Sequence, residues 1–378
     1  MDFTYDGEQV ALRDAVRGLL SKAYGDHDDR RRTVAEDPGF DEKVWARMAE
    51  MGLLGLPFAE ADGGVGAGPV EIGIVCHELG RVIAPEPYLT SVVLAGGLVS
   101  ACGSAEQRAD VLGPLAAGDV VLAFAHDEPG RRWGPTAEQV TATRDGDEWR
   151  LTGVKEPVPH GGHADRLVVS AALPDGGTGL FLVEGADADR SSYRTYDGGR
   201  AARVRLDTAA TPLGESGRDL TDSIATVQDI TRVMAANHAL GAMRAALQAT
   251  TDYLKSRKQF GVTLNTFQAL TFRAVDMYVS LELTGSLVDW ATMVVAGGTP
   301  EDIADAAARA SLQVSRAGRH IGQEAIQLHG GIAMTAEYSV GNYVAHLTAL
   351  DHLLGDGGFH LRRLADAVTD HRTLDPLG

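Results

Sequence analysis

The stretch SRKQFG at residues 256–261 ends a long helical pattern, and the stretch QLHGG at residues 327–331 ends another further along the chain. Arg257, near the end of a helix, can pair bidentately with a pyrophosphate. Phe260 offers a flat apolar face to an adenine or a ribose. Gln327 can hydrogen-bond the polar edge of a ligand, and the glycines that follow let main-chain N–H groups approach it closely. Ordinary helix ends use the same residues, so each motif taken alone favours a simple helix cap.

Residues 214–378 are expected to form long amphipathic helices. No proline interrupts residues 222–258, and apolar residues recur there at helical spacing. The sequence TPED at residues 299–302 is a helix start, with a hydroxyl cap, a proline in the first turn and two acids at the positive end of the dipole. Long antiparallel helices with short loops are typical of a four-helix bundle. The expected helices are Asp222–Lys258, Thr266–Val295, a third from Thr299 to Gly330, Val340–Leu354 and Phe359–Asp370.

The rest of the chain divides into a helical part and a β part. Residues 1–118 show apolar residues at spacings of three and four, which predicts an N-terminal helical domain. Residues 119–213 show short β-branched runs, and the turns DGD and PDGG between such runs predict hairpins. This spacing favours a small antiparallel barrel or sandwich. The expected helices are Gln9–Ser21, Asp41–Met51, Val70–Val82 and Glu106–Ala117, and the expected strands are Val120–Ala125, Gln139–Thr143, Trp149–Thr152, Leu167–Ala171, Gly179–Val183 and Val204–Leu206.

The composition is that of an ordinary globular protein. The 378 residues are 44% hydrophobic and 23% charged, and a chain of this length is expected to form two or three domains. The net charge of −18 argues against a nucleic-acid partner, because phosphate backbones are bound by clustered Lys and Arg. Cys76 and Cys102 are the only cysteines, and the N-terminus lacks the basic and apolar regions of a signal peptide. The apolar stretch Leu89–Cys102 is shorter than the roughly 20 residues of a membrane span. We therefore expect a cytoplasmic protein without a membrane partner.

The two motifs and the order of the three parts resemble the acyl-CoA dehydrogenase family. Members of this family have a helical domain, a small β domain and a four-helix bundle in the same order, and the resemblance covers essentially the whole chain. It implies FAD as the cofactor. In the family the bundle residues reach across a dimer interface and hold the adenine-diphosphate part of the neighbour's FAD, which implies an oligomer here. The matching positions are Arg257, Phe260, Gln268, Gln327, Gly330 and Gly331.

The middle domain departs from the family pattern where a chain contacts its own flavin. In FAHDEPG, Asp127 stands where the family has a threonine that touches the flavin ring. In GVKEPVPH, Pro157 and Pro159 replace a tryptophan over the ring and a threonine near it, with Val158 between them. A proline has no hydroxyl and no N–H to donate. The contacts to the chain's own flavin ring are therefore eroded, and Asp127 and Val158 are the cofactor-binding candidates of this domain.

The family's reaction needs a carboxylate as general base. It removes the proton α to the thioester carbonyl while a hydride leaves the β-carbon for the flavin. Family members carry this glutamate at one of two positions, and these match Leu354 and Thr231, neither of which is an acid. Asp356 is a weak candidate for a replacement, and Asp229 and Asp351 are weaker still. The resemblance therefore leaves the catalytic base unknown.

Other apparent motifs carry less weight. The HGGH stretch at residues 160–163 has no acid or cysteine beside it, so no metal site is expected. Lys155 and Arg150 lie among strands and are expected at solvated edges.

Two functions follow from the resemblance. The first is FAD-dependent dehydrogenation of an acyl-CoA thioester to the 2-enoyl-CoA, with electrons passed to an electron-transfer flavoprotein or a similar acceptor, by a homo-oligomer or a heterotetramer. The alternative is a non-catalytic partner that completes the FAD site of a second, glutamate-bearing chain. Such α2β2 pairs occur in bacteria that degrade steroid or other bulky side chains. A flavin oxidase or monooxygenase on the same fold has no positive feature in its favour.

Overall fold

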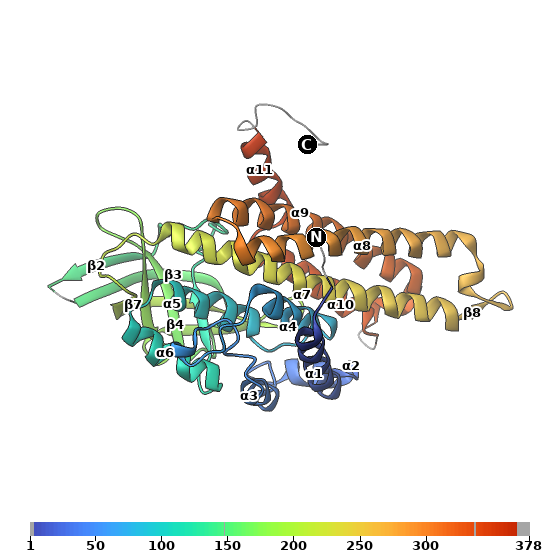
Figure 1. The fold of residues 1–378 in the computed structure, drawn as a ribbon, viewed down its shortest axis with the longest axis horizontal. Helices are drawn as coiled ribbons and strands as arrows, with labels where there is room; N and C mark the ends of the chain where they lie inside the picture. The colour runs from blue at the N-terminus through green and yellow to red at the C-terminus, as the bar shows by residue number, and fades with distance from the viewer. Residues whose placement is uncertain (1–3, 147, 336–337, 369–378) are drawn as a thin grey trace.

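The computed structural model describes residues 4–146, 148–335 and 338–368, and its three parts form one elongated molecule (Figure 1). The β domain lies at one end, and long helices run from it to the other end. The N-terminal helices pack against the middle of the long helices, chiefly through α4 on α7. The three parts therefore meet near the middle of the molecule.

The N-terminal domain is helical, as expected, and side chains cap its helices. Asp6 and Gln9 form a reciprocal capping box at the start of α1, and Ser104 and Gln107 form one at the start of α6. The stretch Tyr88–Cys102 is helical although no helix was expected there. Every side chain from Tyr88 to Gly96 is buried, so this segment has no polar face to reveal a helical period. The elements are α1 (Gly7–Tyr24), α2 (His27–Ala35), α3 (Glu42–Glu50), η1 (Glu60–Asp62), α4 (Pro69–Arg81), η2 (Tyr88–Gly96), α5 (Gly97–Cys102) and α6 (Ala105–Ala117).

The middle domain is a small barrel. Within the described residues its seven-stranded sheet has the order β1-β4-β2-β3-β7-β5, with β6 paired to β7 off this path, and a further pairing of β4 with β5 closes the ring. The expected hairpins are present as the antiparallel pairs β2–β3 and β4–β5. The pairing is antiparallel except that β1 runs parallel to β4, as does β2 at one residue pair. The strands are β1 (Leu122–Ala125), β2 (Thr141–Asp145), β3 (Glu148–Pro159), β4 (Arg166–Ala172), β5 (Thr178–Glu184), β6 (Asp189–Arg194) and β7 (Arg200–Pro212), with the short helix η3 (Gly185–Asp187) before β6.

The C-terminal helices form the bundle, in which α7, α8 and α9 run side by side (Figure 1). Buried alanines of α9 let it pack closely in the bundle, where it contacts α7, and its buried glycines, Gly318 and Gly322, face Leu347 and Val344 of the next helix in the chain. The helix ends differ slightly from expectation: α7 stops at Ser256, and α10 stops at Asp351 so that Leu354 lies in the turn after it. The expected end of the last helix, Asp370, lies outside the described residues. The elements are α7 (Thr221–Ser256), β8 (Lys258–Gln259), β9 (Val262–Thr263), η4 (Leu264–Thr266), α8 (Gln268–Gly297), α9 (Pro300–His329), η5 (Gly330–Met334), α10 (Val340–Asp351) and α11 (Gly357–Ala367).

Candidate functional site

A cavity of ≈ 480 Å³ lies where the three parts meet. The N-terminal domain lines it from α2 and η2, the barrel from the ends of β1 and β3, and the bundle from α7, α10 and the turn after α10. Its walls are mainly apolar, with buried charged groups among them. Its size and this mixture of side chains are typical of a small-molecule site.

The structure brings several predicted positions together on this cavity. Asp127, Pro157, Pro159 and Leu354 all line it, although they come from the barrel and the bundle. Val158 does not, because its side chain is fully buried in the barrel core and faces away from the cavity that the flanking prolines line. A contact of Val158 with a cofactor would therefore have to come from its main chain.

Neither of the two positions that carry the base in the family has a group that can act as a base here. Leu354 presents an aliphatic side chain to the cavity. Thr231 is fully buried, does not line the cavity, and donates its hydroxyl to Val227 O at 2.8 Å. Neither position can accept a proton from a substrate.

The aspartates proposed from the sequence as replacements lie elsewhere. Asp356 accepts a hydrogen bond from Phe359 N at 2.8 Å and so caps α11. Asp229 is held by Arg232 and Arg363 in a buried ion pair. Asp351 and Asp356 line a separate surface groove beside α9. None of these side chains lines the ≈ 480 Å³ cavity, although Asp351 and Leu354 both line a second, smaller pocket of ≈ 180 Å³.

Asp127 is a carboxylate that lines the same cavity as Leu354 and is linked to it through a chain of hydrogen bonds. Arg232 connects the two places, because its Nε donates to Leu354 O at 2.7 Å and its terminal nitrogen donates to Trp133 O at 3.3 Å. Trp133 N in turn donates to Asp127 Oδ1 at 3.3 Å. Burial raises the pKa of Asp127 to about 6. Among the described residues, the cavity is lined by the carboxylates of Asp127, Glu86 and Asp197.

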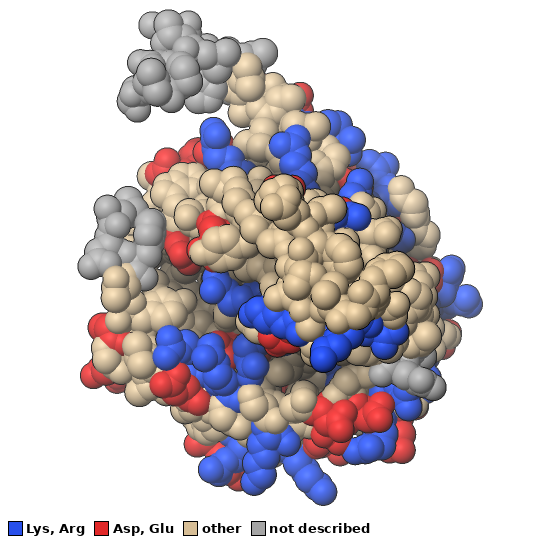
Figure 2. All heavy atoms as spheres, turned by 90° about the vertical axis from the view of Figure 1, so that its right-hand side faces the viewer, with Lys and Arg blue, Asp and Glu red and all other residues tan. Residues whose placement is uncertain are grey.

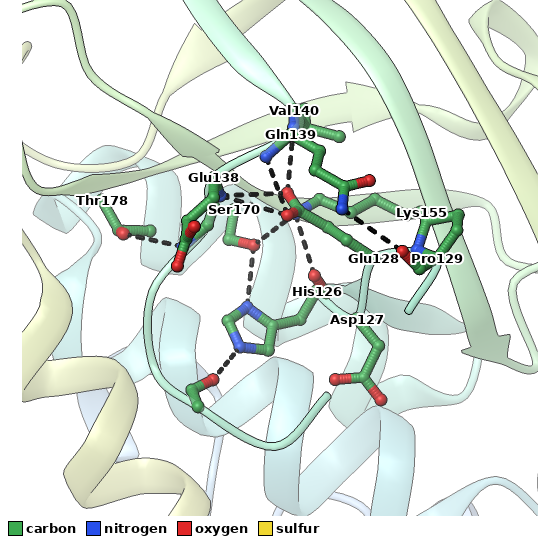
Figure 3. Close-up of polar contacts among 12 residues, drawn as sticks. His126, Asp127, Glu128, Pro129, Glu138, Gln139, Val140, Lys155, Ser170 and Thr178 are labelled. Atoms are coloured by element: carbon green, nitrogen blue, oxygen red, sulfur yellow. Dashed lines mark hydrogen bonds and ion pairs between the residues drawn. The ribbon is translucent and has the colours of Figure 1, made fainter. Parts of the chain in front are cut away.

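Lys155 is not at a solvated edge, and that expectation was wrong. Its side chain is fully buried, and Nζ donates to Glu128 Oε1 at 2.9 Å, to His126 O at 2.9 Å and to Ser170 Oγ at 3.1 Å (Figure 3). The reason is that strand alternation turns Lys155 into the barrel, where Glu128 supplies the opposite charge. The Glu128 carboxylate also accepts main-chain N–H groups of Glu138, Gln139 and Val140.

This network continues into the segment that carries Asp127. Burial lowers the pKa of His126 to about 4, so its ring is neutral near pH 7. His126 Nε2 donates to Gly134 O at 2.5 Å, which leaves Nδ1 to accept from Ser170 Oγ at 2.8 Å. Figure 3 shows Asp127 pointing away from this network. Residues 126–134 are thus anchored on the barrel side while Asp127 faces the cavity.

The residues of the two end motifs lie apart from the cavity, at the β8–β9 end of the bundle. Phe260 is 91% exposed with φ of 53°, and the guanidinium of Arg257 has no hydrogen-bond or ion-pair partner among the described residues. Figure 2 looks onto this end of the molecule, where Lys and Arg side chains surround a hollow in the middle of the face. The structure therefore does not unite the two sets of predicted residues within one chain. Arg257, Phe260, Gln268, Gln327, Gly330 and Gly331 are all exposed, and none of them lines the cavity.

Comparison with known proteins agrees with this architecture. Residues 6–119 match the family described as acyl-CoA dehydrogenase, N-terminal domain, and residues 222–369 match acyl-CoA dehydrogenase, C-terminal domain. The short-chain specific acyl-CoA dehydrogenase of Sus scrofa mitochondria is 30% identical over 319 residues, covering 80% of this chain and 77% of the relative. The probable acyl-CoA dehydrogenase YngJ of Bacillus subtilis is 27% identical over 383 residues, covering 97% of this chain and 99% of the relative.

Two solved structures of heteromeric complexes are also similar. A chain of a variant of the Tcur3481-Tcur3483 steroid ACAD superposes with a TM-score of 0.85 at 32% identity, covering 96% of this chain and 98% of that one. A chain of the ChsE4-ChsE5 complex from Mycobacterium tuberculosis superposes with a TM-score of 0.88 at 26% identity, covering 99% of this chain and 100% of that one. Sequence and fold agree with these relatives, and the chain belongs to the acyl-CoA dehydrogenase family of oxidoreductases.

Proposed function

We propose that this chain is the non-catalytic subunit of a heteromeric acyl-CoA dehydrogenase. In this role it completes the FAD site of a second, glutamate-bearing chain, and the complex converts an acyl-CoA to the 2-enoyl-CoA. The proposal depends on a contrast between two sets of residues, those at the exposed end of the bundle and those at the base positions. The groups suited to a neighbour's FAD are present and exposed, whereas both base positions, Leu354 and Thr231, lack a carboxylate.

The chain's own cavity does not suit a flavin ring. Pro157 and Pro159 line it without a hydroxyl or an N–H to donate, and the half-buried carboxylate of Asp127 faces it. A flavin that accepts a hydride gains negative charge, which a neighbouring carboxylate disfavours. We therefore assign no step of the reaction to a flavin in this cavity.

The exposed end of the bundle does suit the adenine-diphosphate part of FAD. The unpaired guanidinium of Arg257 would bind a pyrophosphate oxygen, Phe260 would lie against the adenine or ribose, and Gln327 would donate to the same group. The cofactor, when bound, supplies the hydride acceptor, and the second chain supplies the base. This chain's residues hold and orient the cofactor.

An apolar stripe on α8 supports an oligomer. Apolar side chains at spacings of three and four residues face outward on this helix. Only 33% of its most apolar 18-residue segment is buried. Exposed apolar surface of this kind is typical of a protein interface. By length and composition α8 would also pass for a membrane-spanning helix, but core helices of bundles pass the same test. The stripe consists of Phe272 (62% exposed), Val275 (50%), Val279 (49%) and Leu283 (63%).

The names of the similar heteromers support the wider setting. One of them is a steroid ACAD, so a bulky acyl group is our proposal for the substrate of the complex. An electron-transfer flavoprotein is our proposal for the acceptor, and the cytoplasm is our proposal for the location. All three rest on family likeness.

The second candidate function is dehydrogenation by this chain itself, with Asp127 as the base. It is favoured by one observation, the placement of Asp127 on the cavity that Leu354 also lines. A carboxylate with a pKa of about 6 is mostly ionised at pH 7 and is able to accept a proton.

Base variants of the purified complex separate the two functions. We expect Asp127→Asn and Asp356→Ala to bleach the flavin anaerobically with an acyl-CoA at the wild-type rate, within about threefold, because neither residue is the base. Loss of the general base would slow bleaching by about 100-fold or more. Bleaching slowed to this extent in Asp127→Asn would contradict the partner role. The same slowing in Asp356→Ala would show that Asp356 is the base, as the sequence suggested.

A further inference from the structure

The cavity contains a buried cation, the guanidinium of Arg30, and no side chain among the described residues pairs with it directly. Arg30 of α2 is 5% exposed and lines the cavity. Its Nε donates to Ile83 O at 2.6 Å, and one terminal nitrogen donates to Asp197 O at 3.1 Å. A guanidinium has five N–H donors. The other terminal nitrogen has no hydrogen-bond partner among the described residues, and no carboxylate among them lies within ion-pair distance of Arg30.

Neither acid near Arg30 pairs with its guanidinium, although Oε2 of Glu86 has no hydrogen-bond partner among the described residues. Glu86 Oε1 accepts from the hydroxyl of Tyr24 and from Asp41 N, and burial raises the pKa of Glu86 to about 7, so it is partly protonated near neutral pH. The Asp197 carboxylate accepts from His346 Nδ1 at 2.9 Å, from Thr195 Oγ1 at 2.6 Å and from Gly199 N at 3.2 Å. Burying an unpaired charge is costly, so Arg30 is poised to pair with an anion from outside the chain.

Arg30 and Leu354 mark different regions of the cavity. Arg30 belongs to the group that includes Asp197 and His346, whereas Leu354 belongs to the group tied together by Arg232. His346 lies in α10 about two turns before Leu354, a separation on the order of 10 Å. The remaining wall includes apolar side chains that suit a hydrocarbon body. These are Leu89, Leu94, Phe124, Leu350 and Leu353.

We propose that this cavity binds an acyl-CoA whose acyl group carries a carboxylate, and that Arg30 pairs with that carboxylate. The apolar wall takes the hydrocarbon body, and the thioester lies toward Leu354. The ligand's negative charge neutralises the buried guanidinium, which a plain alkyl chain leaves unpaired. The proposal takes from the proposed function only that the ligand is a CoA thioester. This cavity is then a binding site separate from the catalytic site of the glutamate-bearing chain, so the proposal requires binding, not turnover.

The test is the binding preference of the full-length chain, isolated with any partner that co-purifies. Isothermal titration calorimetry compares suberoyl-CoA with octanoyl-CoA, which have the same chain length and differ by the terminal carboxylate. We expect suberoyl-CoA to bind at least about 10-fold more tightly, since a hydrogen bond to a charged group gives this order of discrimination. Arg30→Met should abolish the preference, and Arg30→Lys should retain part of it.

The matched control is Arg132→Met. Arg132 also lines the cavity but lies on the side of Asp127 and is exposed, so its loss should leave the preference for suberoyl-CoA intact. Arg30 donates to two main-chain carbonyls, so its replacement could destabilise the fold, and thermal melting must accompany the titrations. If Arg30→Met does not fold, the affinities of Arg30→Lys for the two thioesters test the proposal. Equal affinity for the two thioesters, a preference for octanoyl-CoA, binding of neither, or a preference that survives Arg30→Met would overturn the proposal. None of these outcomes bears on the partner role, which depends on FAD content and not on this preference.

Discussion

Arg257→Ala is expected to weaken FAD binding by the assembled enzyme about 10- to 100-fold, because a charge-assisted hydrogen bond contributes about 1.5–3 kcal/mol. The Arg257 side chain is exposed and makes no contact that stabilises the fold among the described residues. Its loss should therefore leave the melting temperature of the chain unchanged while the complex releases FAD on dilution. Fluorescence of the released flavin, followed against enzyme concentration, measures the affinity.

Arg309→Ala is the control for Arg257→Ala. Arg309 is also an exposed arginine of the bundle, but it pairs with Asp305 four residues away on α9. Removing it should leave FAD affinity within about twofold, because an exposed pair contributes less than about 1 kcal/mol. If Arg257→Ala and Arg309→Ala retain FAD equally, the proposed role of the bundle end in binding a neighbour's cofactor is wrong.

Lys155→Met is expected to destabilise the fold by about 3–5 kcal/mol, because it leaves the buried carboxylate of Glu128 without its cation. The substitution also removes the donor to His126 O and Ser170 Oγ. The loss falls on the barrel and on residues 126–134, the segment that carries Asp127. Urea denaturation followed by tryptophan fluorescence measures the change, since Trp149 lies in the barrel core.

Arg150→Met on the same strand is the control for Lys155→Met. Arg150 is exposed and pairs with Asp207 at the surface, so its removal should cost less than about 1 kcal/mol. Adding Glu128→Gln to Lys155→Met should recover part of the lost stability, because the unpaired charge is then absent. A Lys155→Met protein as stable as Arg150→Met would show that the buried ion pair contributes little.

Local patterns in the sequence were sufficient to predict much of the fold. The start of α9 at Pro300 follows from its capping residues, and the hairpin between β4 and β5 follows from the turn PDGG. The helical segment Tyr88–Cys102 was not predicted, because a segment buried on all sides shows no amphipathic period. The short helix α2 was also missed, since it is mostly charged.

The site was only partly predictable for the same physical reason. Family likeness located Asp127 and Leu354 in the sequence, but their common cavity depends on contacts between the barrel and the bundle. The burial of Lys155 depends on Glu128, which is distant in the sequence. Arg30 carried no local signal, because its significance comes from the cavity that two other parts of the chain complete. The end motifs, by contrast, are local and exposed, and a pattern at a helix end is enough to find them.

The most direct test of the partner role is the number of FAD molecules per chain, measured together with oligomeric mass. Absorbance of protein purified after expression alone gives the flavin content, and light scattering gives the mass. We expect little or no flavin on the chain alone, with FAD retained only when a glutamate-bearing acyl-CoA dehydrogenase chain is co-expressed. About one FAD per chain in a homo-oligomer would contradict the partner role, and would assign the cavity of this chain a flavin of its own.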